Sequence, residues 1–378
     1  MAAMPLAIRG WAQAAHAPRW VYLGTDRGKG IYRARWNART GEIGPLELAA
    51  VTDRPDYLAL HPRLPVLYTV NSVAGEKAAI SSYRLDKSSG TLTPINRISS
   101  HGDGPCFVSV DRTGHAAFTA NYTGGSFAAY RIGHDGALSD AGDLQCKGNT
   151  ACGPLGPVTG RQDAPHLHCT TVSPDNQFVL ACDLGDDAIE VIPFNNNSKQ
   201  LLGQAMRVAA RPGSGPRHVA FHPNGRWVYC IHEVDCTVDL FDWHVTGGAA
   251  NLKHRAGSVV STLANGVALA GNTACEIIVS GDGRFVYTCT RGVDEILVYR
   301  VNPKTGLLTE LQRLSCGGKT PRYIALDPAQ RWLVSCNQGT GATPVGNLAL
   351  FSRDPQTGRL NEPATITAAE TPMFLAWV

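Results

Sequence analysis

The strongest constraint on the fold is a repeat of about fifty residues that runs along the chain. Each unit begins with a proline and continues with an apolar stretch, a Pro- or Gly-containing turn, and two further apolar stretches. The spacings of these prolines are 50, 60, 51, 105 and 51 residues, and the value of 105 spans two units because another unit begins at Ala274. The chain therefore repeats one supersecondary unit instead of combining unrelated elements. The opening prolines are Pro55, Pro105, Pro165, Pro216, Pro321 and Pro372.

The central copy, residues 215–243, shows how a unit is expected to fold. We predict an inner strand at 219–222, a turn at Pro223-Asn224-Gly225, and further strands at 227–232 and 237–243. Proline presets φ and glycine accepts positive φ, so this tripeptide suits a tight turn. The start of the first strand and the end of the second lie at the same edge of an antiparallel hairpin. Arg217 and Glu233 are therefore predicted to lie on one face.

The second strand of the unit can be aligned seven times, and a third strand follows each copy. A four-stranded β unit cannot bury both faces alone, so seven units are predicted to stack around an axis. This predicts an all-β fold, a seven-bladed β-propeller with four-stranded antiparallel blades. The final segment TPMFLAWV resembles an inner strand, and the first unit lacks one, so the C-terminal strand should close the ring and remove a free sheet edge. The second strands begin at Tyr22, Tyr68, Phe118, Leu180, Tyr229, Tyr287 and Val334.

The composition indicates an ordinary globular protein. Of 378 residues, 43% are hydrophobic and 17% charged, and a formal charge of +3 gives no indication of nucleic-acid or membrane-surface binding. We predict a single propeller at 20–378, preceded by a disordered leader at 1–19 without the apolar run that a membrane span needs. We expect a cytoplasmic location, no membrane or nucleic-acid partner, and a monomer or weak homodimer.

The eleven cysteines are scattered, odd in number and without a CxxC pair, which indicates reduced thiols and neither a zinc nor a redox motif. Three of them, Cys182, Cys289 and Cys336, share a repeat position with small apolar residues, so we predict that they serve packing. A His-x-His pair at His166 and His168 is weak evidence for a metal, because it is a single pair. We predict no metal and no cofactor.

Two positions of the repeat hold residues that break its apolar pattern. Both lie at the same edge of the hairpin, so His168, Arg217, Glu233, Arg291 and Arg322 should converge at one mouth of the ring, where an acid–base group meets several cations. The chain has no GxSxG elbow and no phosphate loop before a helix, which favours acid–base chemistry on a small anionic molecule. At the start of the inner strand stand Asp56, Cys106, His168, Arg217, Cys275 and Arg322. Just after the second strand stand Ser72, Tyr122, Leu184, Glu233, Arg291 and Gln338.

Structural roles are the alternatives. Glu233 and Arg291 could form an ion pair between blades, and His168 could be a packed strand histidine. His218 follows Arg217 directly, so strand alternation predicts that it packs between blades, as does Glu276. The Gly-rich insertion at 146–164 and the longer loop at 339–347 could cover a site, as rim loops often do, or be variable surface loops.

Several stretches resemble a known family. GPRHVAFHPNGRWVYCIHE, TACEIIVSGDGRFVYTCTRG, YTGGSFAAYRI and PRYIALDPAQRWLVSCNQ resemble the seven-bladed propeller lactonases, which include bacterial 6-phosphogluconolactonases and the fungal 3-carboxy-cis,cis-muconate lactonizing enzyme. The resemblance covers nearly the whole chain after about Arg19. It implies catalytic residues at His168, Arg217, Glu233 and Arg291. We expect further substrate contacts from His166, Arg322, His232 and Gln338, although His232 stands where the family usually has Asn.

The resemblance implies hydrolysis of a sugar-acid lactone, with 6-phosphogluconolactone first among a class of small anionic lactones. Glu233 would deprotonate the attacking water, Arg217 and Arg291 would hold the oxyanion and the substrate's anionic group, and His168 would protonate the leaving alkoxide. The alternatives are aldaric (glucaro- or galactaro-) lactones, a carboxymuconate cycloisomerase, and a non-catalytic propeller scaffold.

Overall fold

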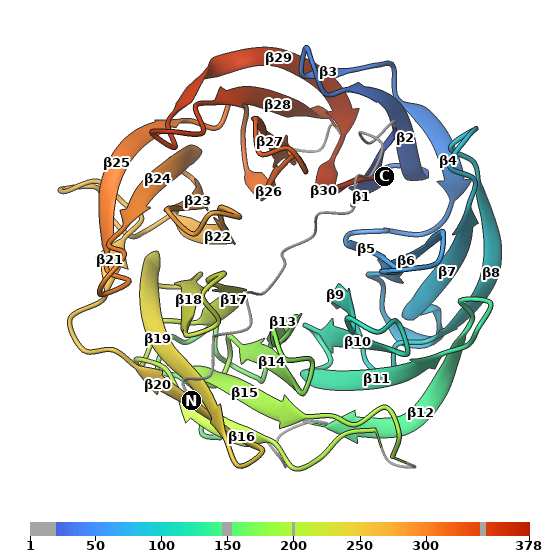
Figure 1. Ribbon diagram of the computed structural model, residues 1–378, viewed down its shortest axis with the longest axis horizontal. Helices are drawn as coiled ribbons and strands as arrows, with labels where there is room; N and C mark the ends of the chain where they lie inside the picture. The colour runs from blue at the N-terminus through green and yellow to red at the C-terminus, as the bar shows by residue number, and fades with distance from the viewer. Residues whose placement is uncertain (1–19, 146–152, 199–200, 341–344) are drawn as a thin grey trace, which may run out of the picture.

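The computed structural model describes residues 20–145, 153–198, 201–340 and 345–378. Seven antiparallel sheets are arranged as blades around a central axis, with the first strand of each blade nearest the axis (Figure 1). The predicted seven-bladed propeller is therefore confirmed. The predicted leader at 1–19 lies outside the described residues, as do 146–152 of the insertion and 341–344 of the last long loop.

The first four blades follow one another along the chain. Blade 1 consists of β30 (Pro372–Trp377), β1 (Trp20–Thr25), β2 (Gly30–Asn37) and β3 (Glu42–Ile43), and β4 (Glu47–Val51) also pairs with β2. Blade 2 consists of β5 (Leu58–Leu60), β6 (Val66–Asn71), β7 (Ala79–Leu85) and β8 (Leu92–Ser99). Blade 3 consists of β9 (Pro105–Val110), β10 (Ala116–Asn121), β11 (Ser126–Ile132) and β12 (Leu138–Gln145). Blade 4 consists of β13 (Leu167–Val172), β14 (Phe178–Asp183), β15 (Ala188–Pro193) and β16 (Met206–Ala209).

The remaining three blades complete the ring. Blade 5 consists of β17 (Pro216–Phe221), β18 (Trp227–His232), β19 (Thr237–Thr246) and β20 (Ala249–His254), and the short β21 (Val260–Ser261) also pairs with β19. Blade 6 consists of β22 (Thr273–Val279), β23 (Phe285–Arg291), β24 (Glu295–Val301) and β25 (Leu308–Ser315). Blade 7 consists of β26 (Pro321–Leu326), β27 (Trp332–Asn337), β28 (Val345–Arg353) and β29 (Leu360–Glu370). The described residues contain one short 3-10 helix, η1 (Gly75–Lys77), and no helix long and apolar enough to cross a membrane.

The two ends of the described chain meet in blade 1. The C-terminal β30 pairs antiparallel with β1, in a register that places Val21 opposite Trp377 and Leu23 opposite Leu375. The predicted closure of the ring by the last strand is thus confirmed. In blade 5, β18 has the predicted bounds, whereas the inner strand begins at Pro216 and not at 219, because Pro216 already pairs with His232.

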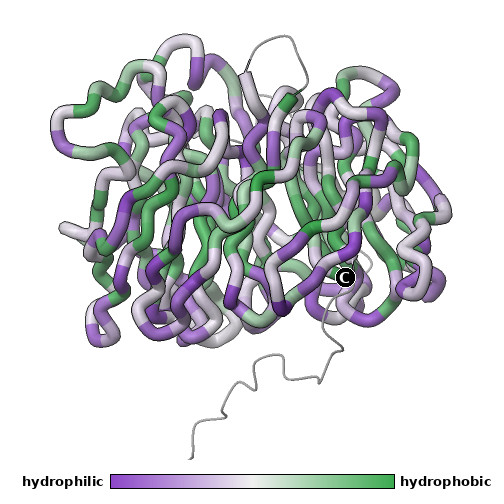
Figure 2. Tube along the Cα trace, turned by 90° about the horizontal axis from the view of Figure 1, so that it is seen from above, coloured by the Kyte–Doolittle hydropathy of each residue, from purple (hydrophilic) through white to green (hydrophobic). Residues whose placement is uncertain are grey.

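The hydrophobic core lies between successive blades. One cluster joins blades 7 and 1 through Val334 and Leu23, and another joins blades 5 and 6 through Leu240 and Leu297. Seen from the side, hydrophobic segments run along the strands, and many of the connecting loops are hydrophilic (Figure 2). Since each blade covers its neighbour, second strands such as β6, β10, β14 and β18 are buried on both faces.

The cysteines at the shared repeat position belong to this core. Cys182, Cys289 and Cys336 have no exposed surface and no disulfide partner. Their counterparts Val70 and Ile231 are also fully buried. The prediction that this position serves packing is correct.

Candidate active site

A β-bulge recurs at the start of the inner strands and directs side chains into the central channel. In blade 5, Pro216 pairs with His232 and His218 with Ile231, which leaves Arg217 as the extra residue. A bulge changes the direction in which a side chain points, and bulges are common beside active sites. In blade 2 the ladder begins only at Leu58, and Asp56 lies just before it at the corresponding place. The same irregularity places Cys106, His168, Arg322 and Met373 at the bulges of blades 3, 4, 7 and 1.

Glu233 is the centre of an ionic cluster at one mouth of the channel. It follows β18, and its backbone N–H donates to the carbonyl of Gly215 at 2.8 Å. Its Oε2 lies 2.9 Å from Arg217 Nε and 2.8 Å from Arg291 Nη2. Arg161 Nη2 contacts the other oxygen, Oε1. His168 Nε2 lies 3.8 Å from Oε2.

The electrostatics of this cluster fix two protonation states. Burial raises the pKa of Glu233, but Arg291 and Arg217 oppose it and hold the pKa well below its ordinary value. Burial lowers the pKa of His168 well below its ordinary value, and Arg217 and His218 add to the effect. At neutral pH the site therefore contains an ionised carboxylate and an uncharged imidazole.

Arg161 is a site residue that no repeat position could predict. It belongs to the insertion before blade 4, and a buried neighbour fixes this segment: Gln162 accepts from the N–H of Val158 at 3.0 Å and donates to the carbonyl of Leu184 at 2.9 Å. Of the two interpretations open for the insertion, a cover over a site and a variable surface loop, the contact between its described part and Glu233 favours the first. The length of the insertion was the only signal available from the sequence.

A cavity of about 380 Å³ opens beside the cluster, lined from several blades by Asp56, Tyr122, His168, Glu233 and Arg322, among others. A second, much smaller space of about 20 Å³ shares Asp56, His168 and Arg322 with it and also borders Arg217. The larger space can hold a small sugar derivative, and the smaller one can hold a single water molecule.

Arg322 differs from the other arginines of the site. In the described part of the chain it forms no ion pair with a carboxylate, and its Nε is buried without a hydrogen-bond partner. Burial and the guanidinium group of Arg291 lower the pKa of Arg322. An unpaired, largely desolvated cation that lines a cavity is a ready site for an anion.

Two of the remaining predicted residues lie near the cavity without lining it. The His166 ring stacks on Tyr122 with ring centroids 4.5 Å apart, and its Nδ1 lies 3.0 Å from the Tyr122 carbonyl oxygen. It can therefore affect the cavity wall only through Tyr122. Gln338 lies at the same rim, where its Nε2 donates to Asp26 at 3.1 Å.

His232 is not brought into the site. It has no exposed surface, and its Nε2 lies 3.3 Å from Asp239 Oδ2 inside blade 5. The reason is that His232 is still part of the β18 ladder, opposite Thr237, whereas Glu233 lies past the end of the strand. The expectation that His232 contacts substrate needs correction.

His218 does not pack between blades as predicted. Its ring centroid lies 5.2 Å from that of Phe107 in blade 3 and 6.4 Å from that of Tyr57 next to blade 2. His218 therefore lies in the central channel. Its Nδ1 donates to Glu276 Oε1 at 2.8 Å. The prediction failed because the bulge at Arg217 interrupts the two-residue alternation of the strand.

Aromatic rings close the channel beneath the ionic cluster. The ring centroid of Tyr57 lies 4.0 Å from that of Phe107 and 4.2 Å from that of Phe374. The centroids of Tyr323 and Phe374 are 4.1 Å apart. Of these residues Tyr57 borders the small space beside Arg217, and such apolar surroundings lower the local dielectric constant and strengthen ionic interactions nearby.

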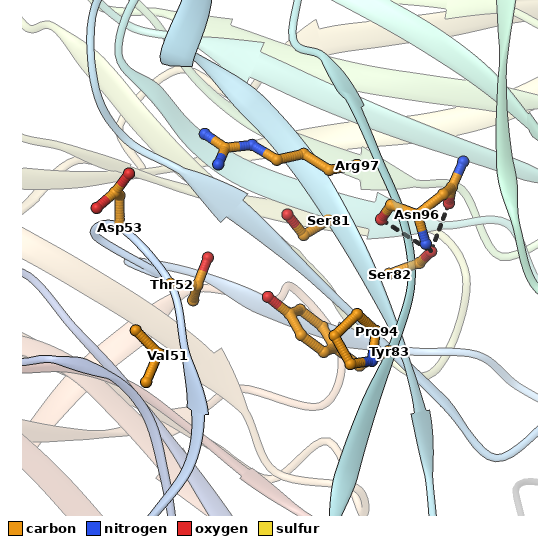
Figure 3. A pocket seen from close by; sticks show the side chains of 9 residues that line it. All are labelled: Val51, Thr52, Asp53, Ser81, Ser82, Tyr83, Pro94, Asn96 and Arg97. Carbon is orange, nitrogen blue, oxygen red and sulfur yellow. Dashed lines mark hydrogen bonds between the residues drawn. The ribbon is translucent and has the colours of Figure 1, made fainter.

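Another cavity of about 380 Å³ lies between β4 and the β7–β8 hairpin (Figure 3). Its polar side chains already have partners within the protein, since Asn96 binds Ser82 and the carbonyl of Leu138. Asp53 and Arg97 are its only charged lining residues. The channel cavity, with its convergent charges, is therefore the candidate active site.

The molecule is thus a seven-bladed propeller with a charged cavity in its channel, and comparison with known proteins identifies its class. The family described as "Lactonase, 7-bladed beta-propeller" matches residues 20–377. The chain belongs to this family and is a lactonase.

Relatives of known name span nearly the whole chain. A 6-phosphogluconolactonase of Bacillus subtilis is 33% identical over 350 residues, covering 92% of this chain and 95% of its own. A 6-phosphogluconolactonase of Formosa agariphila is 29% identical and covers 89% and 93%. The structure of a periplasmic gluconolactonase from Pseudomonas aeruginosa aligns with a TM-score of 0.85 at 28% identity, covering 95% of this chain and 98% of that one.

Proposed function

We propose that the protein hydrolyses 6-phosphogluconolactone to the open acid in the channel cavity. The observation that carries the proposal is the excess of positive charge: Arg161, Arg217, Arg291 and Arg322 meet at the site, and in the described chain Glu233 is the carboxylate that pairs with the first three. A phosphate monoester, with nearly two negative charges at neutral pH, would offset most of this excess. The names of the two relatives point to the same substrate.

Arg322 is the proposed phosphate ligand. It lines the cavity and has no carboxylate partner in the described residues, so an anion does not have to displace an existing ion pair to reach it. Guanidinium groups bind phosphate oxygens in a bidentate manner, which fixes orientation as well as charge. The remaining arginines are then available for the oxyanion that develops on the lactone carbonyl.

For Glu233 we propose a positioning role. A general base works best with a pKa near the operating pH. The arginines keep the pKa of Glu233 well below that range and occupy both of its oxygens, so it is a weak proton acceptor. It holds three guanidinium groups at fixed distances instead. His168 is uncharged in the free enzyme, so it can orient a water or a substrate hydroxyl, but it has no extra proton to give.

A second candidate substrate is unphosphorylated gluconolactone, which the name of the Pseudomonas aeruginosa relative favours. Aldaric lactones would also satisfy an arginine cluster through a second carboxylate. A cytoplasmic location and a monomeric or weakly dimeric state remain predictions.

A lactone panel tests the proposal. Ring opening of 6-phosphogluconolactone, glucono-1,5-lactone and glucaro-1,4-lactone is followed with a pH indicator, and carboxymuconate cyclisation by loss of ultraviolet absorbance. We expect the highest kcat/KM for the phosphorylated lactone. Arg322→Gln should lower that value by about 10- to 150-fold, the loss of a charge-assisted hydrogen bond of 1.5–3 kcal/mol, and change gluconolactone turnover far less.

Arg300→Gln is the matched control, because Arg300 is an exposed arginine on β24. It should leave all rates unchanged. A wild-type preference for an unphosphorylated lactone would contradict the proposal, as would an equal loss on both substrates in Arg322→Gln.

A further inference from the structure

Asp56 is a buried acid that the site described so far leaves without a role. It lies between Pro55 and Tyr57 at the entrance to β5, and only 7% of its surface is exposed. Its Oδ1 is buried without a hydrogen-bond partner. A buried carboxylate oxygen without a hydrogen bond is costly, because its desolvation is not offset. Asp183, Asp186, Glu190 and Glu276 also have one such oxygen, but Asp56 lines the cavity, where a ligand or a water can be its partner.

The nearest cation does not neutralise Asp56. Arg54 Nη2 lies 3.8 Å from Asp56 Oδ2, but only 2.7 Å from Asp26 Oδ1. Arg54 is therefore bound mainly to Asp26 at the rim. In this respect Asp56 differs from Glu233, because three arginines pair with the oxygens of Glu233.

Asp56 lines both the substrate-sized cavity and the water-sized space beneath it. In the cavity wall it comes from the second blade, while Glu233 follows the second strand of blade 5 and Arg322 lies in blade 7. The small space is also bordered by His168 and Arg217, so a water there has several polar partners. A lactone bound in the cavity would have this water and Asp56 next to each other at its inner side.

We propose that Asp56 is the catalytic residue that accepts the proton of the attacking water and returns it to the ring oxygen. The proposal rests on lactone hydrolysis as the function of the site. The water oxygen forms a bond to the carbonyl carbon while one water O–H bond breaks and its proton passes to Asp56. The carbonyl electron pair moves onto its oxygen beside the guanidinium groups.

The second step reverses the flow of charge. The carbonyl re-forms, the bond from the carbonyl carbon to the ring oxygen breaks, and the leaving oxygen takes the proton from Asp56. Asp56 is a carboxylate again, one water has been added to the lactone, and the new carboxylic acid loses its own proton to solvent. One residue can serve both steps if its pKa lies near the operating pH.

The environment of Asp56 provides that condition. Burial raises its pKa to about 7, against the opposing attraction of Arg54. A pKa in this range leaves the carboxylate form of Asp56 available to accept a proton at neutral pH. The cavities and the segment of Asp56 bring further charged and titratable groups near it. These groups are Arg54, Asp26, Tyr57, Cys106, Tyr122, His168, Arg217, His218, Glu233 and Arg322.

The test compares D56N with D53N on 6-phosphogluconolactone. Asp53 is exposed and lies three residues earlier in the same segment, so the control makes the same change outside the cavity. D56N should lower kcat by about 10²–10⁴-fold with KM within a few-fold, whereas D53N should match the wild type. In the wild type, kcat/KM should rise with pH through about 7, and D56N should lose this limb. The titration of the substrate phosphate near pH 6 should remain in both proteins.

A rescue experiment separates chemistry from folding. D56A leaves room for a small carboxylate, so added formate should restore part of kcat in a concentration-dependent way and should have no effect on D53N. A wild-type kcat/KM that is flat from about pH 6.5 to 8 overturns the proposal without any variant. So does a D56N protein that keeps the limb while His168→Gln loses it.

The two proposals fail in different ways. If the wild type turns over another lactone better than 6-phosphogluconolactone, the substrate assignment is wrong, and the same variants on that lactone still test Asp56. If 6-phosphogluconolactone is the best substrate and D56N retains kcat, only the role of Asp56 is wrong.

Discussion

Replacement of Glu233 by Gln should destabilise the protein more than almost any other isosteric change of a carboxylate. Glu233 is 5% exposed and contacts three guanidinium groups, two of them at 2.9 and 2.8 Å. Removing one partner of a buried ion pair typically costs about 3–5 kcal/mol, because the other charge stays buried and unpaired. The Gln amide keeps one acceptor for Arg217, so we expect about 3 kcal/mol, the lower end of that range.

The pH dependence gives the prediction a second signature. The pKa of Glu233 is held well below its ordinary value in the folded protein, whereas the unfolded chain should show about 4.3. The folded state therefore binds fewer protons, and the stabilisation is present above about pH 4.3 and lost as the pH falls towards the folded pKa. The difference in unfolding free energy between wild type and Glu233→Gln should be constant near neutral pH and shrink below about pH 4.

Urea unfolding followed by tryptophan fluorescence measures this difference. The control is Glu310→Gln, because Glu310 is an exposed carboxylate 3.0 Å from Arg313, a pair expected to contribute about 0.2–1 kcal/mol. Inorganic phosphate should raise the urea midpoint of Glu233→Gln by occupying the unpaired arginines. A Glu233→Gln protein no less stable than the control, with an unchanged acid slope, would refute the electrostatic reasoning.

Two further predictions concern the ring and its core. Deletion of 372–378 removes β30 and exposes the edge of β1. The truncated chain should therefore aggregate and lose cooperative unfolding, as measured by light scattering and circular dichroism. A soluble protein with the wild-type unfolding midpoint would contradict ring closure as a source of stability. Cys336→Ser places a hydroxyl at a position with no exposed surface. It should lower the free energy of unfolding in urea by about 1–3 kcal/mol and leave lactone turnover per folded molecule unchanged. A stable variant with altered kcat would show that this thiol does more than pack.

The repeat was sufficient to predict the fold because every blade solves the same burial problem. Seven aligned second strands and a C-terminal segment without a hairpin predicted both the number of blades and the closure through β30, and both are confirmed. Arg217 and Glu233, sixteen residues apart and predicted to lie at the same edge of a hairpin, are 2.9 Å from each other. Position within a repeat is a strong predictor when the backbone repeats with it.

The predictions failed where the backbone departs from a regular strand. His218 was assigned by two-residue alternation, and the bulge at Arg217 turned it into the channel. The family resemblance places His232 at the pocket, but His232 still pairs with Thr237 within β18, whereas Glu233 lies past the end of that ladder. Arg161 lies in an insertion that has no counterpart in other blades, so no alignment of units could place it beside Glu233.

Asp56 shows a different limit. It occupies the same repeat position as His168, Arg217 and Arg322, and so was visible from the sequence as a member of that set. What distinguishes it from these three is a carboxylate oxygen that is buried without a partner, because Arg54 binds Asp26 more closely. The pairing of Asp56 depends on whether Arg54 lies closer to Asp26 or to Asp56, and this is determined by how blades 1 and 2 pack together.

The charge distribution suggests why the site is arranged with one firmly paired carboxylate and one nearly free. Arg161, Arg217, Arg291 and Arg322 would repel one another strongly at close range, and Glu233 offsets this repulsion by pairing with the first three. A second fully ionised carboxylate beside Arg322 would neutralise the remaining cation and compete with an anionic substrate for it. Asp56 avoids this because burial raises its pKa to about 7, so it carries charge for only part of the time. The cluster can then remain attractive to a phosphate and still contain a group able to take up a proton.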